Sequence, residues 1–312
     1  MSVRSDKLDF VGKRNWFFLF SFIVILPGVV FLIINPGLRA GIDFRGGSTM
    51  TLAFSKEVTQ QELRSQLASL GEVDSTVQSF GDNTYFLRTR QLSASEREGI
   101  LSALESSLSP DGIEVLSSDL VSPVVARETI LNGAYAVIAA AVGIFIYLWW
   151  AFRSVPRPFR YGLAALVALV HDLVIVVGIF AILGNLMGLE VNTMFLVAVL
   201  TVIGYSVNDT IVVFDRLREN VTNYGNRGFD QNVNVSISET IGRSLNTSLT
   251  LLIVLMALLL FGGATIRTFL IVLIIGVVAG TYSSIAVASQ MLVVWENGDF
   301  GRLLPFRRSA TA

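Results

Sequence analysis

The chain has 312 residues, of which 53% are hydrophobic and only 15% are charged, and its net charge is −1. This composition excludes a chain that folds entirely in water, and so small a net charge argues against a nucleic-acid partner. There is no cysteine and a single histidine, His171, which excludes disulfides, thiolate chemistry and any metal site built on two histidines.

Six apolar stretches are long enough to cross about 30 Å of hydrocarbon as helices. In chain order, we predict transmembrane helices at 16–34, 129–151, 159–184, 191–214, 244–262 and 266–295. The apolar part of the first stretch, about 19 residues, is longer than the core of a signal peptide, and no small-residue cleavage motif follows it. We therefore interpret it as an uncleaved membrane anchor.

Lysine and arginine residues gather on one side of the predicted membrane. They lie in the N-terminal tail 1–15, in the short loop after the second span, in the loop 215–243 and in the C-terminal tail 296–312. Because positive charge is retained in the cytoplasm, both termini are predicted to be cytoplasmic. The segment 35–127 then lies outside the membrane.

The external segment 35–127 shows the alternation of strands and helices expected of a small α+β domain. Gly81, Asp82 and Asn83 predict a hairpin turn, and Ser95 with Glu98 predicts a helix capping box. Hydrophobic spacing predicts a strand near 50–54, a helix near 63–70, strands at 73–80 and 84–90, a helix after 95 and a strand at 113–119. This order is the ferredoxin-like βαββαβ pattern.

The fourth span carries two polar residues, Asn208 and Asp209, between apolar neighbours. A charged side chain in hydrocarbon costs roughly 2.5–3.5 kcal/mol on insertion scales. Asp209 lies six residues before Asp215, where this span is predicted to end, so it would lie about 9 Å deep. Either Asp209 is solvated at the interface, or it is a buried functional carboxylate that faces protein or water.

The fifth span begins with the polar stretch "ETIGRSLNTSLT". Arg243, Asn246, Thr247 and Thr250 recur at spacings of three and four, so they share one helix face. Since neighbouring spans run antiparallel, this face could lie at the depth of Asp209, and we predict an ion pair between Asp209 and Arg243. Alternatively, Arg243 is an ordinary anchor at the cytoplasmic boundary.

Two further spans carry unusual residues. His171 and Asp172 lie together near the middle of the third span, which fits either a proton or water path or a structural hydrogen bond. In the sixth span, Gly276 and Gly280 form a GxxxG pattern, which predicts a close helix-packing seam. No pattern indicates nucleophilic catalysis, a phosphate loop or a metal cluster, so we do not expect an enzyme. The glycine-rich stretch "GIDFRGGS" is predicted to be a turn that enters the first strand.

Five motifs together resemble the SecD/SecF family of protein-export membrane subunits, part of the resistance-nodulation-division superfamily. The fourth-span sequence "GYSVNDTIVVFDRLREN" is the most specific of them, and "VHDL", "GRSLNTSLTLL" and "GTYSSIAVAS" resemble signatures of the third, fifth and sixth spans. "GIDFRGG" resembles the motif that opens the family's external domain, through Gly41, Asp43, Phe44, Gly46 and Gly47. Two positions, Arg45 and Ser122, depart from the family pattern.

The resemblance implies a fold, partners and a mechanism. It implies six transmembrane helices with one small ferredoxin-like external domain between the first two, in a bacterial plasma membrane. The implied partners are SecD, the SecYEG channel with the ATPase SecA, the unfolded polypeptide in transit, and membrane lipid. Protons would be the coupling ion, with no other cofactor and no metal. A half-size antiporter that exchanges small molecules for protons, and a scaffold that transports nothing, are the alternatives.

The resemblance also implies roles for individual residues. Asp209 would be the carboxylate of the proton path, Arg243 the arginine that answers it and Thr247 the nearby threonine, with Asn208 beside the carboxylate. His171 and Asp172 match polar positions of less defined role.

Overall fold

The computed structural model describes residues 9–34, 37–73, 75–79, 81 and 83–299, without the side chains of 264 and 265. Residues 1–8 and 300–312 of the predicted cytoplasmic tails, and Phe80 and Asp82 of the predicted hairpin, lie outside the described residues. The chain divides into a helical unit, within Met1–Arg39 and Tyr135–Ala312, and an external-domain unit, Ala40–Ala134.

The external unit has the predicted order of strands and helices. Its elements are β1 (Gly47–Phe54), α3 (Gln60–Ser69), β2 (Thr76–Ser79), β3 (Thr84–Thr89), α4 (Ala94–Leu108) and β4 (Ile113–Val121), preceded by a short helix α2 (Ile42–Arg45). The strands pair antiparallel in the order β2-β3-β1-β4. This four-stranded antiparallel sheet with two main helices confirms the predicted fold class for this unit. The short helix α2 was not predicted.

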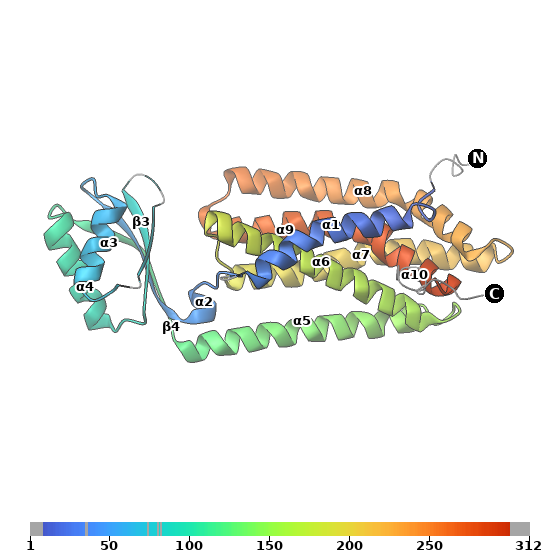
Figure 1. Cartoon of the computed structure of the whole chain (residues 1–312), viewed down its shortest axis with the longest axis horizontal. Helices are drawn as coiled ribbons and strands as arrows, with labels where there is room; N and C mark the ends of the chain where they lie inside the picture. The colour runs from blue at the N-terminus through green and yellow to red at the C-terminus, as the bar shows by residue number, and fades with distance from the viewer. Residues whose placement is uncertain (1–8, 35–36, 74, 80, 82, 300–312) are drawn as a thin grey trace, which may run out of the picture. The chain divides into compact units, whose positions relative to one another are not determined.

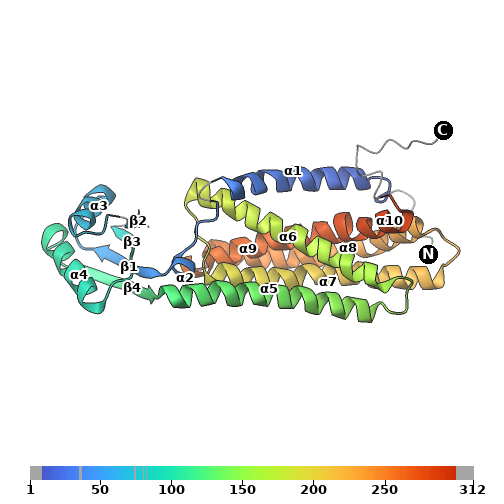
Figure 2. The same ribbon diagram turned by 60° about the horizontal axis from the view of Figure 1, so that its bottom comes forward.

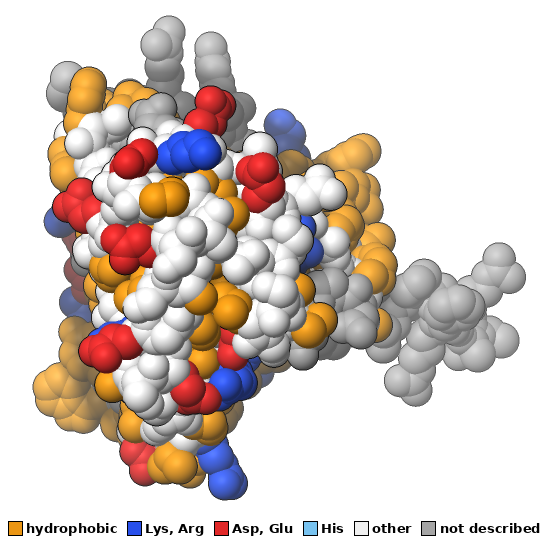
Figure 3. Space-filling model, turned by 90° about the vertical axis from the view of Figure 1, so that its left-hand side faces the viewer, with side chains coloured by type: hydrophobic (Ala, Val, Ile, Leu, Met, Phe, Trp, Pro, Cys, Tyr) orange, Lys and Arg blue, Asp and Glu red, His pale blue; other side chains and the backbone are white. Residues whose placement is uncertain are grey.

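Alternating side chains of the strands make the core of the external unit. Met50, Leu52 and Phe54 of β1 point toward the helices and are buried with Leu63 of α3 and Leu104 of α4. Since side chains alternate across a strand, the opposite face of β1 carries threonine and alanine instead. Figure 3 looks onto this domain, where basic and acidic side chains lie scattered among apolar and neutral groups.

Both helices of the external unit begin with a capping box, but the second one differs from the prediction. Ser93 and Glu96 form it, rather than Ser95 and Glu98. Two sequence matches to S-x-x-E overlap here, and the Ser48 hydroxyl accepts a hydrogen bond from the amide of Leu92, which fixes the chain just before the earlier match. The backbone and hydroxyl of Ser93 lower the pKa of Glu96 to about 2, with a contribution from Arg90.

Six helices of the described chain are long and apolar enough to cross a membrane. They are α1 (Arg14–Ile33), α5 (Pro123–Ala151), α6 (Pro158–Met187), α7 (Thr193–Asn223), α8 (Phe229–Phe261) and α9 (Ala264–Ser283), the last continuing through a π-helical turn (Ser284–Ala288) into α10 (Ser289–Asn297). Their number and order are as predicted. However, α7 and α8 extend through most of the predicted loop 215–243, which leaves only residues 224–228 between them. Where the membrane boundaries fall along these helices stays a prediction.

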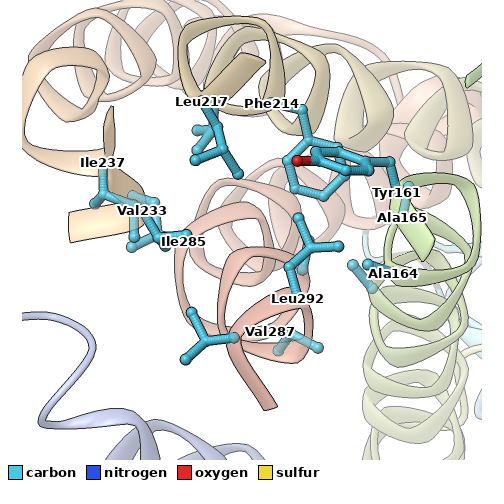
Figure 4. Close-up of a cluster of buried hydrophobic side chains, with 14 of the residues drawn as sticks. Tyr161, Ala164, Ala165, Phe214, Leu217, Val233, Ile237, Ile285, Val287 and Leu292 are labelled. Carbon is cyan, nitrogen blue, oxygen red and sulfur yellow. The ribbon is translucent and has the colours of Figure 1, made fainter. Parts of the chain in front are cut away.

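Helix α9 runs through the middle of the helical unit, with α6, α7 and α8 around it (Figures 1 and 2). The apolar stretches of α6 and α7 are half buried within the chain, whereas few residues of those of α1 and α5 are buried. At the α10 end of the bundle, apolar side chains of α6, α7, α8 and the π-helical turn converge, as Figure 4 shows for Tyr161, Phe214, Ile237, Ile285 and Leu292. Thus α6, α7 and α9 form the centre of the helical unit, and α1 and α8 pack against them.

Glycines set the spacing of the closest helix pairs. A Cβ on Gly280 of α9 would lie 2.9 Å from the Cα of Ser206 on α7, and one on Gly276 would overlap the methyl groups of Val202. The GxxxG stretch therefore faces α7 directly. A second close contact joins Gly28 of α1 to Gly178 of α6, where an added Cβ would lie 2.8 Å from the opposing Cα.

Candidate functional site

The polar side chains of the bundle converge on four consecutive residues, 281–284, which are the last three of α9 and the first of the π-helical turn. Thr281 hydrogen-bonds Asp209 of α7, and Ser284 lies 3.1 Å from the hydroxyl of Thr210 on the same helix. Between them, Tyr282 contacts α1 and Ser283 contacts Asp172 of α6. One helical turn of α9 therefore joins three helices through hydroxyl groups. We call these residues the α9 hub.

Local sequence signals fix where the helices that carry these side chains begin and end. Helix α6 begins with Pro158, whose missing amide proton is not needed in a first turn, and ends at Gly188 in the left-handed conformation. Helix α7 begins with Asn192, whose side chain accepts a hydrogen bond from the amide of Phe195 at 3.0 Å. After the hub, the hydroxyl of Ser289 bonds the carbonyl of Ser284, five residues back, within the widened π-helical turn.

Asp172 is a fully buried carboxylate with three short hydrogen bonds. Its Oδ2 accepts from Ser206 of α7 at 2.5 Å and from Ser283 of the α9 hub at 2.7 Å. Its Oδ1 lies 2.9 Å from Nδ1 of His171, its neighbour on α6. Short bonds from several donors stabilise an ionised carboxylate. Asp172 is therefore held as a fixed junction of α6, α7 and α9.

Asp209 is equally buried but has much weaker partners. Its Oδ2 lies 3.3 Å from the hydroxyl of Thr281 and 3.5 Å from that of Ser248 on α8. These two hydroxyls are themselves 2.5 Å apart, and Tyr205 donates to Ser248 at 3.1 Å. The result is a row of three hydroxyls that ends on the carboxylate.

The partners of Asp209 can serve both of its protonation states. The hydroxyl of Thr281 has a second acceptor, the carbonyl of Val277, at 2.8 Å. When Asp209 is ionised, Thr281 can donate to it; when Asp209 carries a proton, the hydroxyl can turn to Val277 and accept instead. A single hydroxyl rotation therefore lets Thr281 form a hydrogen bond with either form of Asp209.

The predicted ion pair between Asp209 and Arg243 does not form within this chain. Arg243 and Thr247 lie on an exposed face of α8, and Asn208 is exposed on α7, whereas Ser244 and Ser248 face the bundle. The predicted grouping of polar residues on one face of α8 is correct, because helical spacing sets it. The prediction that this polar face meets Asp209 is wrong: the face with Ser244 and Ser248 packs inward instead, because small serines at a spacing of four pack more closely than an arginine.

The glycine-rich motif near the start of the external unit makes a tight backbone junction. Gly46 and Gly47 have φ values of +75° and +129°, which side-chain-bearing residues rarely adopt. A Cβ on Gly46 would lie 3.1 Å from Cα of Pro123, and one on Gly47 would lie 2.7 Å from the carbonyl oxygen of Thr89. Asp43 and Phe44 lie in the helical turn α2 just before, and Gly41 precedes that turn, so the motif has a structural role where β1 enters the sheet.

Sequence analysis missed the hydroxyl partners of both carboxylates. Ser206, Ser248, Thr281 and Ser283 are all buried in the bundle. The GxxxG stretch that ends in "GTYSS" was interpreted as a packing seam, although four consecutive hydroxyl-bearing residues in an apolar helix signal hydrogen bonding to other helices. Within the described residues, no three His, Asp or Glu side chains are grouped so as to hold a metal ion.

Comparison with known families agrees with this architecture. The family described as "Protein export membrane protein SecD/SecF, C-terminal" matches residues 102–298, and the "SecD/SecF GG Motif" matches residues 31–58. The second match contains the Gly46–Gly47 junction. The first contains both buried carboxylates and the α9 hub.

Individual relatives cover nearly the whole chain. The protein translocase subunit SecF of Thermobaculum terrenum is 44% identical over 97% of this chain and 98% of its own length. That of Anaerolinea thermophila is 40% identical over 94% of this chain and 96% of its own length. The protein translocase subunit SecDF of Bacillus subtilis is 36% identical over 94% of this chain, but only 39% of that longer protein is covered.

Among solved structures, SecDF from Thermus thermophilus, described as a translocon-associated membrane protein, is similar to this chain with a TM-score of 0.81 and 31% identity. The match covers 95% of this chain and 40% of SecDF, so the chain spans well under half of that protein. Six apolar helices, the external βαββαβ unit, two family matches and full-length relatives all agree, and the chain belongs to the SecD/SecF family of protein-export membrane proteins.

Proposed function

We propose that this chain works with SecD as a proton-driven accessory subunit of the Sec translocon, which promotes late stages of protein export. The observation that carries the proposal is the setting of Asp209, a buried carboxylate whose hydroxyl partners can serve both its charged and its protonated state. Such a group can take up a proton on one side of the membrane and release it on the other.

The available energy is sufficient for a conformational cycle. One proton that crosses the membrane releases roughly 2.3 kcal/mol per 100 mV of potential. A pH difference adds about 1.4 kcal/mol per unit. Two helix packings that differ by a few kcal/mol could therefore be driven in turn by one or two protons.

SecD is the proposed partner in the membrane because the polar face of α7 and α8 is incomplete in this chain. Asn208, Arg243 and Thr247 are exposed there, beside the buried Asp209. An arginine near hydrocarbon favours a protein counter-charge or water over lipid. We propose that a SecD helix covers this face and that Arg243 meets a carboxylate of SecD, so that the proton path runs between the two subunits.

Export would follow from motion of the external domain, which we place on the outer side of a bacterial plasma membrane with both termini inside. The domain is joined directly to one membrane helix: β4 ends at Val121 and α5 begins at Pro123, with Ser122 between them accepting a hydrogen bond from Val125. A shift of α5 would thus reach the domain without a flexible linker. The domain would hold or release the unfolded polypeptide that SecA threads through SecYEG.

The test compares two aspartates of one helix. Asp209→Asn keeps the shape of the side chain but removes its titration, whereas Asp215→Asn, six residues along α7, changes an exposed carboxylate that pairs with Arg218. We expect Asp209→Asn to abolish gradient-dependent release of an exported protein from vesicles, with normal subunit abundance and normal co-purification with SecD. Asp215→Asn should retain most of the stimulation.

Two results would contradict the proposal. One is full gradient stimulation by Asp209→Asn at wild-type abundance. The other is a variant Asp209→Asn that exports normally but has lost proton-coupled efflux of a small molecule. That result would favour a half-size antiporter.

A further inference from the structure

Helix α1 packs along α6, but few of its side chains are buried. Along the whole of α1, which is described throughout, only Ser21 and Gly28 are buried. Gly28 makes a backbone contact with Gly178, and neither glycine has a side chain that could form a hydrogen bond. Ser21 is the polar contact in the middle of the helix, because its hydroxyl lies 3.0 Å from Nε2 of His171 and 3.2 Å from the hydroxyl of Tyr282.

The hydrogen atoms of this contact can be counted. Tyr282 has one hydroxyl proton, and the carbonyl of Phe17, 2.7 Å away, can only accept it. Tyr282 therefore has no proton for Ser21, so Ser21 must donate to Tyr282 if a hydrogen bond joins them. The single proton of Ser21 is then used, and Nε2 of His171 must itself carry a proton and donate to Ser21.

The other ring nitrogen of His171 faces a carboxylate. Nδ1 lies 2.9 Å from Oδ1 of Asp172, whose other oxygen already accepts two hydroxyls, from Ser206 and Ser283. Two hydroxyl donors on one oxygen favour the carboxylate form. With Asp172 ionised, Nδ1 carries the proton of this contact, and both ring nitrogens are protonated.

Charge leads to the same conclusion. His171 and Asp172 are both buried, 8% and 1% exposed. A neutral imidazole beside an ionised Asp172 would leave a net negative charge inside the bundle, which is costly without a counter-charge. An imidazolium cancels that charge. The titratable groups bonded to or stacked on His171 are Asp172 of its own helix and Tyr282 of α9; α1 presents only the hydroxyl of Ser21, and α7 presents Ser206 to the carboxylate, with Asp209 beyond it.

We infer that His171 is held as an imidazolium, paired with Asp172, and that it starts a one-way hydrogen-bond chain through Ser21 and Tyr282 to the carbonyl of Phe17, which fixes α1 to α6 and to the α9 hub. His171 is then a positioning residue.

This inference concerns α1 and does not depend on the proposed function. It does link the two carboxylates in space, because consecutive residues of the α9 hub contact Asp209, α1 and Asp172 in turn. A displacement of Thr281 on proton exchange would also move Tyr282, the next residue, and so disturb the contact between Tyr282 and α1.

The protonation state can be read directly because the chain has one histidine. The full-length protein, labelled with 15N in its histidine ring, would be reconstituted in lipid bilayers and measured by solid-state NMR at about pH 7.5, where a solvated imidazole is mostly neutral. We expect two protonated ring nitrogens. A signal from one unprotonated ring nitrogen in the wild-type protein would overturn the inference.

Two variants test whether the charge of Asp172, rather than the packing around it, keeps both ring nitrogens of His171 protonated. Asp172→Asn removes the counter-charge, so one of the two protonated nitrogen signals should be lost. Asp209→Asn should leave both signals in place. If Asp172→Asn also kept both protons, the ion pair would not be what holds them.

The attachment of α1 is tested by distance. The chain has no cysteine, so spin labels can be placed at two exposed positions, Ile23→Cys on α1 and Val170→Cys on α6. Ser21→Ala and Tyr282→Phe should each broaden the distance distribution. Thr201→Val, which removes a hydroxyl that bonds only the carbonyl of Val197 in its own helix, is the matched control. Distributions equally narrow in all four proteins would refute a role of this chain of bonds in holding α1.

Discussion

Replacement of Gly280 by alanine should disturb both carboxylates at once, because this glycine sets the distance between α7 and α9. The new methyl carbon would lie 2.9 Å from Cα and Cβ of Ser206 and 3.2 Å from its hydroxyl oxygen, where ordinary contacts are 3.4–4 Å. The atoms nearest to it include backbone, so a side-chain rotation cannot relieve the overlap. The two helices must separate locally by about 0.5 to 1 Å.

The consequence can be estimated from the bonds that cross this contact. A separation of that size takes the 3.3 Å bond from Thr281 to Asp209 beyond hydrogen-bond length. It also stretches at least one of the two bonds to Oδ2 of Asp172, because Ser206 donates to this oxygen from α7 and Ser283 from α9. Inserting a methyl group into a close-packed interior typically costs about 1–3 kcal/mol. That corresponds to a roughly fivefold to 150-fold lower folding equilibrium constant.

The matched control is Gly143→Ala on α5, where an added Cβ meets nothing within 4 Å. Both variants gain the same helix propensity, roughly 0.5–1 kcal/mol, so their difference isolates the clash. Reversible unfolding of the purified proteins in mixed detergent micelles, followed by circular dichroism, gives the free energy of unfolding. Equal values for the two variants would refute the reasoning that Gly280 maintains the spacing of α7 and α9.

Two further predictions concern topology and the external domain. Single cysteines at Ser106 in α4 and Asn226 between α7 and α8 should react differently with a membrane-impermeant thiol reagent in intact cells, the first labelled and the second protected; the reverse pattern would mean the opposite orientation. The isolated external domain, 36–126, should fold by itself and lose stability in acid, because the Ser93 cap lowers the pKa of Glu96 from its ordinary 4.5 to about 2. This stabilisation is complete above the unfolded value and is lost as the pH falls from about 4.5 toward 2. Glu96→Gln should flatten that part of the pH–stability curve measured by thermal melts, and Glu98→Gln, with the same charge change two residues away, should not.

The elements of this protein could be predicted from its sequence because their signals are local. Long apolar runs define the six helices, and the alternation of Met50, Leu52 and Phe54 defines the first strand. The capping box of α4 could not be placed with the same certainty, since two overlapping S-x-x-E matches satisfy the local rule and a tertiary hydrogen bond from the amide of Leu92 to Ser48 favours one of them.

The polar centre was only partly predictable for a physical reason. A charged residue in an apolar span stands out, so Asp209, Asp172 and His171 were identified. A serine or threonine does not, because its hydroxyl can bond the carbonyl of its own helix, as Thr201 does. Thr281 does this as well and also reaches Asp209, and only the packing of α9 against α7 distinguishes the two cases.

The exposed polar face of α7 and α8 also has a consequence for the life of the protein in a cell. In a copy without its partner, Arg243, Thr247 and Asn208 would face lipid instead of protein. The loss of the polar contacts proposed between this face and SecD would lower the stability of the inserted chain. Copies made in excess of SecD would then be short-lived, because membrane proteases degrade incompletely packed subunits. We expect the half-life of this chain, measured by pulse-chase, to rise when SecD is co-expressed, so that the abundance of one subunit sets the abundance of the other.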